Sequence, residues 1–144
     1  MTINPRVAKS VREMRARLRD LAAAEHGHAQ SKTAAAADHV ADQHALLEDT
    51  LDEAEDTLTS ITNVYALDDI ANLVVSQRAA IMDAEKLHSA ATEIAELAHA
   101  RLRARIRQLK TAERVVELVD RERTSREART EQRSHDDLTS ARRR

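Results

Sequence analysis

The stretch IMDAEKLHSAATEIAELAHARLRARIRQLKTAERVVELV (81–119) decides the fold, because its apolar residues recur at alternating steps of three and four. A mean spacing of about 3.5 residues is the period of a left-handed coiled coil. We therefore expect one long helix whose apolar seam packs against another helix. The seam residues are Ile81, Ala84, Leu87, Ala91, Ile94, Ala98, Leu102, Ile106, Leu109, Ala112, Val116 and Val119.

An earlier stripe with the same spacing provides the partner helix. It begins with Val7, Val11, Met14, Leu18 and Leu21, and it resumes with Leu47, Leu51, Ala54, Leu58 and Ile61. Between the two parts, the positions that continue the three- and four-residue spacing hold mostly polar or small residues. This predicts weak packing in the middle of the seam. These positions are Glu25, His28, Lys32, Ala35, His39 and Asp42.

Turn signals are scarce, since the 144 residues include one Gly and one Pro. Asn4 and Pro5 suit the start of a helix, and Gly27 weakens a helix without ending it. The segment TSITNVYALDD (59–69) gathers Thr, Ser, Asn and β-branched residues, and Asp68 or Asp69 can cap a following helix. We predict one all-α domain over 1–144, with a helix over about 5–61, a turn over about 62–68 and a helix over about 69–140.

The expected architecture is a long antiparallel two-helix coiled-coil hairpin. A turn near Tyr65 pairs Val11 with Val119, Leu18 with Ala112 and Leu46 with Ala84. Tyr65 itself either packs over the turn or contacts a partner. The second helix then outlasts the first, so a projecting C-terminal helix ends in EQRSHDDLTSARRR (131–144). We expect this segment to bind a surface outside the chain.

The composition argues against an enzyme. Catalytic pockets are walled by bulky apolar and aromatic side chains, and this chain has one Tyr and no Phe, Trp or Cys. No run of about 18 apolar residues predicts direct membrane insertion, and the start shows no apolar leader segment. The expectation is a soluble cytoplasmic protein without cofactors.

Charge is distributed unevenly along the chain. Residues 33–77 contain ten acids and no Lys or Arg, whereas 1–32 contain seven basic residues and three acids. RLRARIRQLK (101–110) adds five basic residues and no acid. The hairpin is therefore expected to have an acidic tip and a basic base, which can attract two different partners. The alternative is that these charges only keep exposed helix faces soluble.

Metal and nucleic-acid binding are not predicted. Three Glu and His pairs have the spacing found in di-iron bundles, but the four-helix core that supplies the other carboxylates is missing. These pairs are Glu25 with His28, Glu85 with His88, and Glu96 with His99, and we expect His88 and His99 to flank the seam. Residues 120–144 offset eight Arg with six acids, unlike a basic DNA-reading helix.

The segment ERVVELVDRERTSREARTEQRSHDDLTSARRR (113–144) resembles the end of the FliJ/YscO family, the central stalk proteins of flagellar and virulence type III export ATPases. The likeness is carried by Glu113 and Arg114, by alternating Glu and Arg over 117–129, and by Glu131-Gln132 followed by Asp136-Asp137. Two positions depart from the family pattern. Members often have an apolar residue in place of His135 and Glu in place of Asp137.

The resemblance implies a non-enzymatic stalk that binds a hexameric ring ATPase and links it to a membrane protein of the export gate. Some members also handle export chaperones. Such a protein lies in the cytoplasm, peripherally associated with the inner-membrane export apparatus. The gate-facing surface would lie over about 35–85, and the alternative is a generic structural coiled coil for dimerisation or tethering. The implied ATPase-binding residues are Arg121, Arg123, Arg126, Arg129, Glu131, Gln132, Arg133, Asp136 and Asp137.

Overall fold

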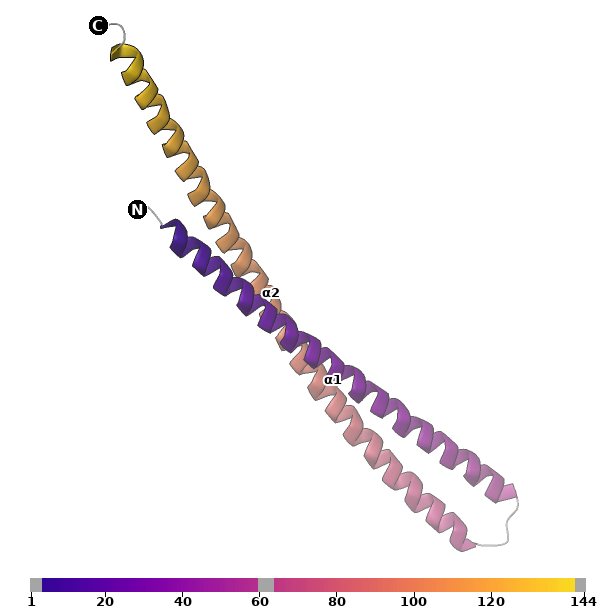
Figure 1. Ribbon diagram of the computed structural model, residues 1–144. Coiled ribbons are helices and arrows are strands. Elements are labelled where there is room, and N and C mark those ends of the chain that lie inside the picture. Colours follow the sequence, from indigo (N-terminus) through magenta and orange to yellow (C-terminus); the bar gives the residue numbers. More distant parts are fainter. Residues whose placement is uncertain (1–3, 60–63, 142–144) are drawn as a thin grey trace. The chain divides into compact units, whose positions relative to one another are not determined.

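Two long helices account for the described structure. A computed structural model describes the backbone of residues 4–59 and 64–141, and the side chains of 4–59 and 65–136. Helix α1 spans Pro5–Thr59 and helix α2 spans Val64–Ala141 (Figure 1). Apart from Asn4, every residue described is helical, and no strand occurs among them. The predicted all-α class is confirmed, with two long helices packed against each other.

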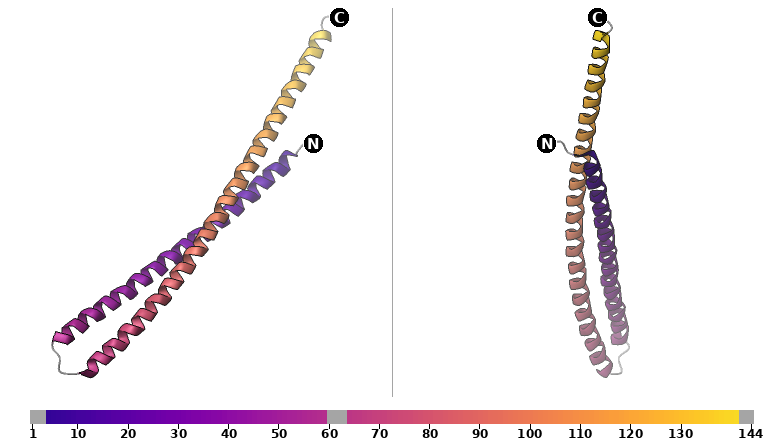
Figure 2. Two further views of the ribbon diagram at one scale, coloured as in Figure 1. Left: turned by 180° about the vertical axis from the view of Figure 1, so that it is seen from behind. Right: turned by 60° about the vertical axis from the view of Figure 1, so that its left-hand side comes forward.

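The start of α1 agrees with its sequence signals. The side-chain Oδ1 of Asn4 accepts a hydrogen bond from the backbone N–H of Arg6 at 2.9 Å, as an N-cap residue does. Pro5 is the first helical residue, where its missing N–H costs nothing. Gly27 lies inside α1, which continues as an unbroken ribbon in both views of Figure 2.

Helix α2 begins at Val64, five residues earlier than the sequence predicted. Asp68 and Asp69, expected to cap the helix, lie inside it and are exposed. The early start is explained by packing, because Leu67 and Ile70 are half-buried and tertiary contacts outweigh the weak helix propensity of the first residues. Tyr65 is 80% exposed, which is at odds with packing over the turn. Ile61 lies outside the described residues.

The contacts divide the chain into two compact units, each containing a segment of both helices. Unit 1 consists of Met1–Ala23 and Arg101–Arg144, and unit 2 consists of Ala24–Ala100. Each unit is described by itself below.

Unit 1 has a narrow core. The guanidinium of Arg15 donates a hydrogen bond from Nη1 to Oε1 of Gln108 at 2.6 Å, which joins the two helix segments. Helix α1 contributes small residues to the core and α2 contributes larger ones. The buried residues are Ala8, Ala22, Leu109, Ala112 and Val116.

Unit 2 is held by polar as well as apolar contacts. The hydroxyl of Thr33 donates to the carbonyl of Ala91 at 3.1 Å, and Nε2 of Gln77 donates to Oγ1 of Thr50 at 2.7 Å. Later residues of α1 thus contact earlier residues of α2, so the two segments run antiparallel. The buried residues are Ala29, Thr50, Ile81, Ala84 and Ala98.

The predicted seam of α1 is wrong by one residue over much of its length. The six polar or small positions assigned to the middle of the seam are all exposed. Their places are taken by the next residue in each case, namely His26, Ala29, Thr33, Ala36, Val40 and Gln43, all buried or half-buried. In unit 1, Ala8 and Ala22 are likewise buried, whereas Val7 and Leu21 are 55% and 63% exposed. Small side chains at the contact let two helices approach closely, which favours alanine there.

The predicted seam of α2 is largely confirmed. Most of its residues are buried or half-buried, and the two exceptions are Leu87 and Ile94, which are exposed. His88 and Ala95 are half-buried in their place, so the prediction that His88 flanks the seam is wrong.

The contacts that join the two helices lie three to seven residues earlier in α2 than the predicted register places them. Val11 lines a groove with Ala112 and Val115, not with Val119. In unit 2, the carbonyl of Leu46 accepts a hydrogen bond from Gln77, seven residues before the predicted partner Ala84. The earlier start of α2 accounts for the shift in its register.

Candidate protein-binding surface

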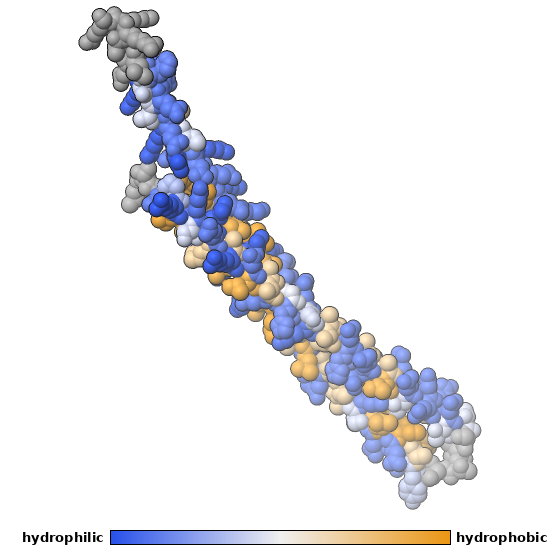
Figure 3. Space-filling model, in the orientation of Figure 1, coloured by the Kyte–Doolittle hydropathy of each residue, from blue (hydrophilic) through white to orange (hydrophobic). Residues whose placement is uncertain are grey.

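The last part of α2 in unit 1 contributes nothing to the core. Each residue over 121–136 is exposed, and Ala128 is the one apolar side chain in this range. Figure 3 shows the surface of this stretch as almost uniformly hydrophilic. A helix segment without an apolar stripe gains no stability from packing within its own chain, so its charged side chains are available to a partner.

Two ion pairs at i, i+4 spacing support the helix here. Arg123 Nε lies 2.7 Å from Glu127 Oε1, and Arg126 Nη2 lies 3.3 Å from Glu122 Oε2. Both pairs have the i, i+4 spacing that brings side chains together on a helix. All four side chains are more than half exposed, and exposed pairs stabilise a helix only weakly. The two ion pairs therefore hold the charged side chains in position but add little to the stability of the fold.

The Arg123 guanidinium has a perturbed proton affinity. The hydrogen bond to Glu127, followed by the negative charge of that carboxylate, raises the pKa of Arg123 above its ordinary value. A guanidinium is already protonated throughout the physiological range. Attraction between this surface and an acidic partner will therefore not be switched off by Arg123 as the pH changes.

Helical geometry gathers most of the predicted ATPase-binding residues on one side of α2. At about 100° per residue, six of them fall within an arc of about 140°. Arg123 and Glu131 lie outside this arc. Asp137 belongs to α2, but its side chain is not among those described. The six residues that share the arc are Arg121, Arg126, Arg129, Gln132, Arg133 and Asp136.

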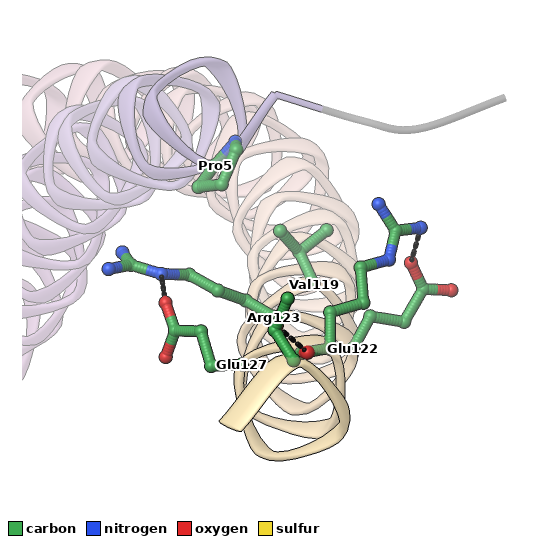
Figure 4. Close-up of a pocket in the computed structure, with 7 residues that line it drawn as sticks. Pro5, Val119, Glu122, Arg123 and Glu127 are labelled. Carbon is green, nitrogen blue, oxygen red and sulfur yellow. Dashed lines mark hydrogen bonds and ion pairs between the residues drawn. The ribbon is translucent and has the colours of Figure 1, made fainter. Parts of the chain in front are cut away.

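A shallow pocket lies where the start of α1 meets this part of α2. In Figure 4, Val119 points toward Pro5, and the pair of Arg123 and Glu127 lies to one side of it, with Glu122 on the other. Arg126 also lines the pocket. Arg123 and Arg126 therefore both border the contact with α1.

The three Glu and His pairs singled out in the sequence do not converge on a metal centre. The rings of His26 and His99 stack with centroids 5.0 Å apart, and His44 Nε2 lies 3.9 Å from Glu85 Oε1. Within 4–59 and 65–136, no three His, Cys, Asp or Glu side chains gather as a metal site would require. In the same part of the chain, neither helix has a stretch apolar enough to cross a membrane.

Comparisons with protein-family models, with curated proteins and with solved structures found no match. The assignment of a function therefore rests on the geometry and charge of this surface together with the resemblance of residues 113–144.

Proposed function

We propose that the chain is a non-enzymatic stalk or adaptor of a flagellar or virulence type III protein export apparatus. The observation that carries the proposal is the exposure of every residue over 121–136, a segment that contains five Arg. Arginine side chains bind carboxylates in a bidentate geometry, which gives both affinity and orientation. In this proposal, the segment binds the hexameric export ATPase.

The proposed architecture is an antiparallel two-helix coiled-coil hairpin whose C-terminal helix projects beyond α1. Three observations support it. The buried positions of both helices alternate at steps of three and four, the segments run antiparallel within each unit, and α2 has 78 residues against 55 in α1. A hairpin of this kind would fit the pore of a ring-shaped ATPase.

A second surface would bind the export gate membrane protein. Unit 2 has exposed acids at Glu48, Asp49, Asp52, Glu53 and Glu55, within the range of 35–85 implied by the resemblance. These carboxylates would attract a basic partner surface. Binding at this end would hold the protein at the cytoplasmic side of the inner membrane, and export chaperones are further candidate partners.

Deletion of all residues after Thr124 tests the assignment of the ATPase-binding surface. We expect the helical content of 1–124 to be retained, because the residues over 125–136 are all exposed, and the stimulation of the purified export ATPase to be lost. Replacement of Arg126, Arg129 and Arg133 by Glu should weaken binding at physiological salt by at least about tenfold, since several charged contacts reverse sign. Calorimetry measures the affinity, and circular dichroism measures the helical content.

A matched control reverses three charges in unit 2. Glu48→Lys, Asp52→Lys and Glu55→Lys together should leave ATPase binding unchanged and impair binding to the gate protein. If the truncated chain binds and stimulates the ATPase as well as the full chain does, the assignment of 121–136 is wrong. The alternative, a structural coiled coil for dimerisation or tethering, is favoured by the exposed leucines of α2 and would then be preferred.

A further inference from the structure

The two units carry large and opposite charges. Unit 1 contains twenty Lys and Arg against ten Asp and Glu, a net charge of +10. Unit 2 contains three Lys and Arg against fifteen Asp and Glu, a net charge of −12. The two values add to the −2 of the whole chain, so the small net charge conceals a strong separation.

Unit 1 has an exposed apolar face beside its core. A groove on this side of the unit is lined by residues of both helices. They include Val7 and Val11 of α1 and Thr111 and Val115 of α2. Met14 and Leu21 continue the stripe of α1 at seven-residue steps from Val7, and Leu118 follows Val115 by one turn. We call these apolar residues the unit 1 face; Val115 is half-buried and the others, Val7, Val11, Met14, Leu21 and Leu118, are exposed.

Basic side chains border the unit 1 face. Arg17 lies one turn from both Met14 and Leu21, and Arg114 lies one turn from Leu118. Both side chains are exposed.

Unit 2 has an exposed apolar face on α2. The contact of His44 with Glu85 marks one flank of the unit. Leu87 follows Glu85 by two residues, which turns the helix by about 200°, so Leu87 lies on the opposite flank. Ile94 lies seven residues after Leu87, on the same side of the helix. We call the stripe of Leu73, Leu87, Ile94 and Leu97 the unit 2 face; all four side chains are exposed.

Acidic side chains border the unit 2 face. Asp42 and Asp49 of α1 lie two residues before His44 and five residues after it. At about 100° per residue, both point away from the flank of His44, so they lie on the same flank as Leu87. Both are exposed. The unit 2 face therefore has the same apolar character as the unit 1 face and the opposite charge at its border.

We propose that two copies of the chain associate, with the unit 1 face of one copy packed on the unit 2 face of the other. The α1 stripe of the unit 1 face, about 21 Å long over 7–21, would pack on the stripe of the unit 2 face, about 36 Å long over 73–97. The Arg side chains that border the first face would then meet the Asp side chains that border the second. Packing of like faces would place like charges together. Each copy has both faces, so either copy can supply either one. This inference does not rest on the proposed function.

The small core of each unit supports such a contact. Among the described residues, six of the nine buried hydrophobic residues are alanines outside the two faces, and each buries little area; they are Ala8, Ala22, Ala29, Ala84, Ala98 and Ala112. A second copy would cover large apolar side chains that the chain leaves in water.

Sedimentation equilibrium of the full chain at low salt tests the proposal. We expect a dimer that dissociates more readily as salt screens the charges at the border. Ile94→Glu should weaken dimerisation by at least about tenfold, because it places a carboxylate in the unit 2 face. Met82→Glu is the matched control: Met82 lies on the same helix in the same unit, is 59% exposed against 60% for Ile94, and points to another side.

Charge exchange makes the test specific for a second copy. One variant has Arg17→Glu with Arg114→Glu, and the other has Asp42→Lys with Asp49→Lys. Each variant alone should dimerise at least about tenfold more weakly than the natural sequence, and an equimolar mixture should recover dimers that contain one copy of each. Circular dichroism checks that each variant keeps its helical content.

Three outcomes would overturn the proposal. They are a chain that remains monomeric at low salt, equal effects of Ile94→Glu and Met82→Glu, and a mixture of charge variants that does not form mixed dimers. Binding of a different protein to these faces by a strictly monomeric chain would also overturn it.

Discussion

Units 1 and 2 use the same spacing of contact positions but fill it with different side chains. In unit 1, Leu109 and Val116 of α2 pack toward a segment of α1 that buries Ala8 and Ala22. In unit 2, the contact positions include polar residues, and Thr50 is buried. Two of these polar residues bond across the contact, Thr33 to the Ala91 carbonyl and Thr50 to Gln77. Unit 1 also has a hydrogen bond between its segments, from Arg15 to Gln108, but that bond is exposed. One periodicity can therefore place hydrogen bonds at the exposed edge of a contact or within it, and the second kind selects particular partners.

The largest effect should come from the apolar contact of unit 1. Leu109→Ala should lower the free energy of unfolding by about 2–3 kcal/mol, because it removes buried methyl groups and leaves a cavity. Leu109 is 9% exposed. Val75→Ala in the same helix should change the free energy of unfolding by less than about 0.5 kcal/mol, since Val75 is 68% exposed and belongs to neither apolar face. Urea unfolding measures both, and equal losses would contradict the placement of the core.

The polar contact of unit 2 should respond less strongly and in a different manner. Thr50→Val removes the closer of the two acceptors of the Gln77 amide and leaves the Leu46 carbonyl at 3.3 Å, so stability should fall by about 1 kcal/mol. Adding Gln77→Leu should recover most of that loss, because both polar partners are then replaced by apolar groups. Thr111→Val in unit 1 is the control, since its exposed hydroxyl bonds within its own helix. A double variant that is less stable than Thr50→Val would show that the contact is not an isolated pair.

Gly27→Ala should stabilise the protein by about 0.5–1 kcal/mol, because alanine loses less conformational entropy on helix formation. A Cβ at this position would have no atom within 4 Å. The variant tests the start of unit 2, where the predicted and observed seams differ. The melting temperature measures the effect, and a decrease would indicate that α1 does not pass through Gly27 as a regular helix.

The smallest effect should come from Glu127→Gln at the end of unit 1. Loss of the exposed pair with Arg123 should slightly reduce the helicity of the last part of α2 and leave the unfolding midpoint unchanged. The raised pKa of Arg123 contributes stability that is fully present below the ordinary Arg value and lost only above it. Stability measured between about pH 5 and 9 should therefore show no pH dependence that arises from this group. If the removal of Glu127 changed the pH dependence of stability in that range, the result would contradict this account.

Much of the fold and of the candidate surface could be predicted because both depend on local features. The N-cap at Asn4, the tolerance of Gly27, most of the α2 seam and the Glu122–Arg126 pair follow from neighbouring residues. The exposure of 121–136 follows from the lack of large apolar residues there. The position of Arg123 beside Pro5 could not be predicted, because it depends on where α1 begins relative to α2.

The sequence by itself determined that the chain forms long helices with seams of alternating three- and four-residue steps. Only the tertiary structure decided which of two adjacent stripes on α1 forms the contact, and it selected Ala8 and Ala22 over Val7 and Leu21. Only the tertiary structure placed Val11 beside Ala112 and not Val119. The physical reason is that a shift of seven residues returns a heptad seam to itself, so periodicity alone cannot distinguish the two registers. The close approach that favours alanine likewise depends on the distance between the two helices, which no local pattern contains.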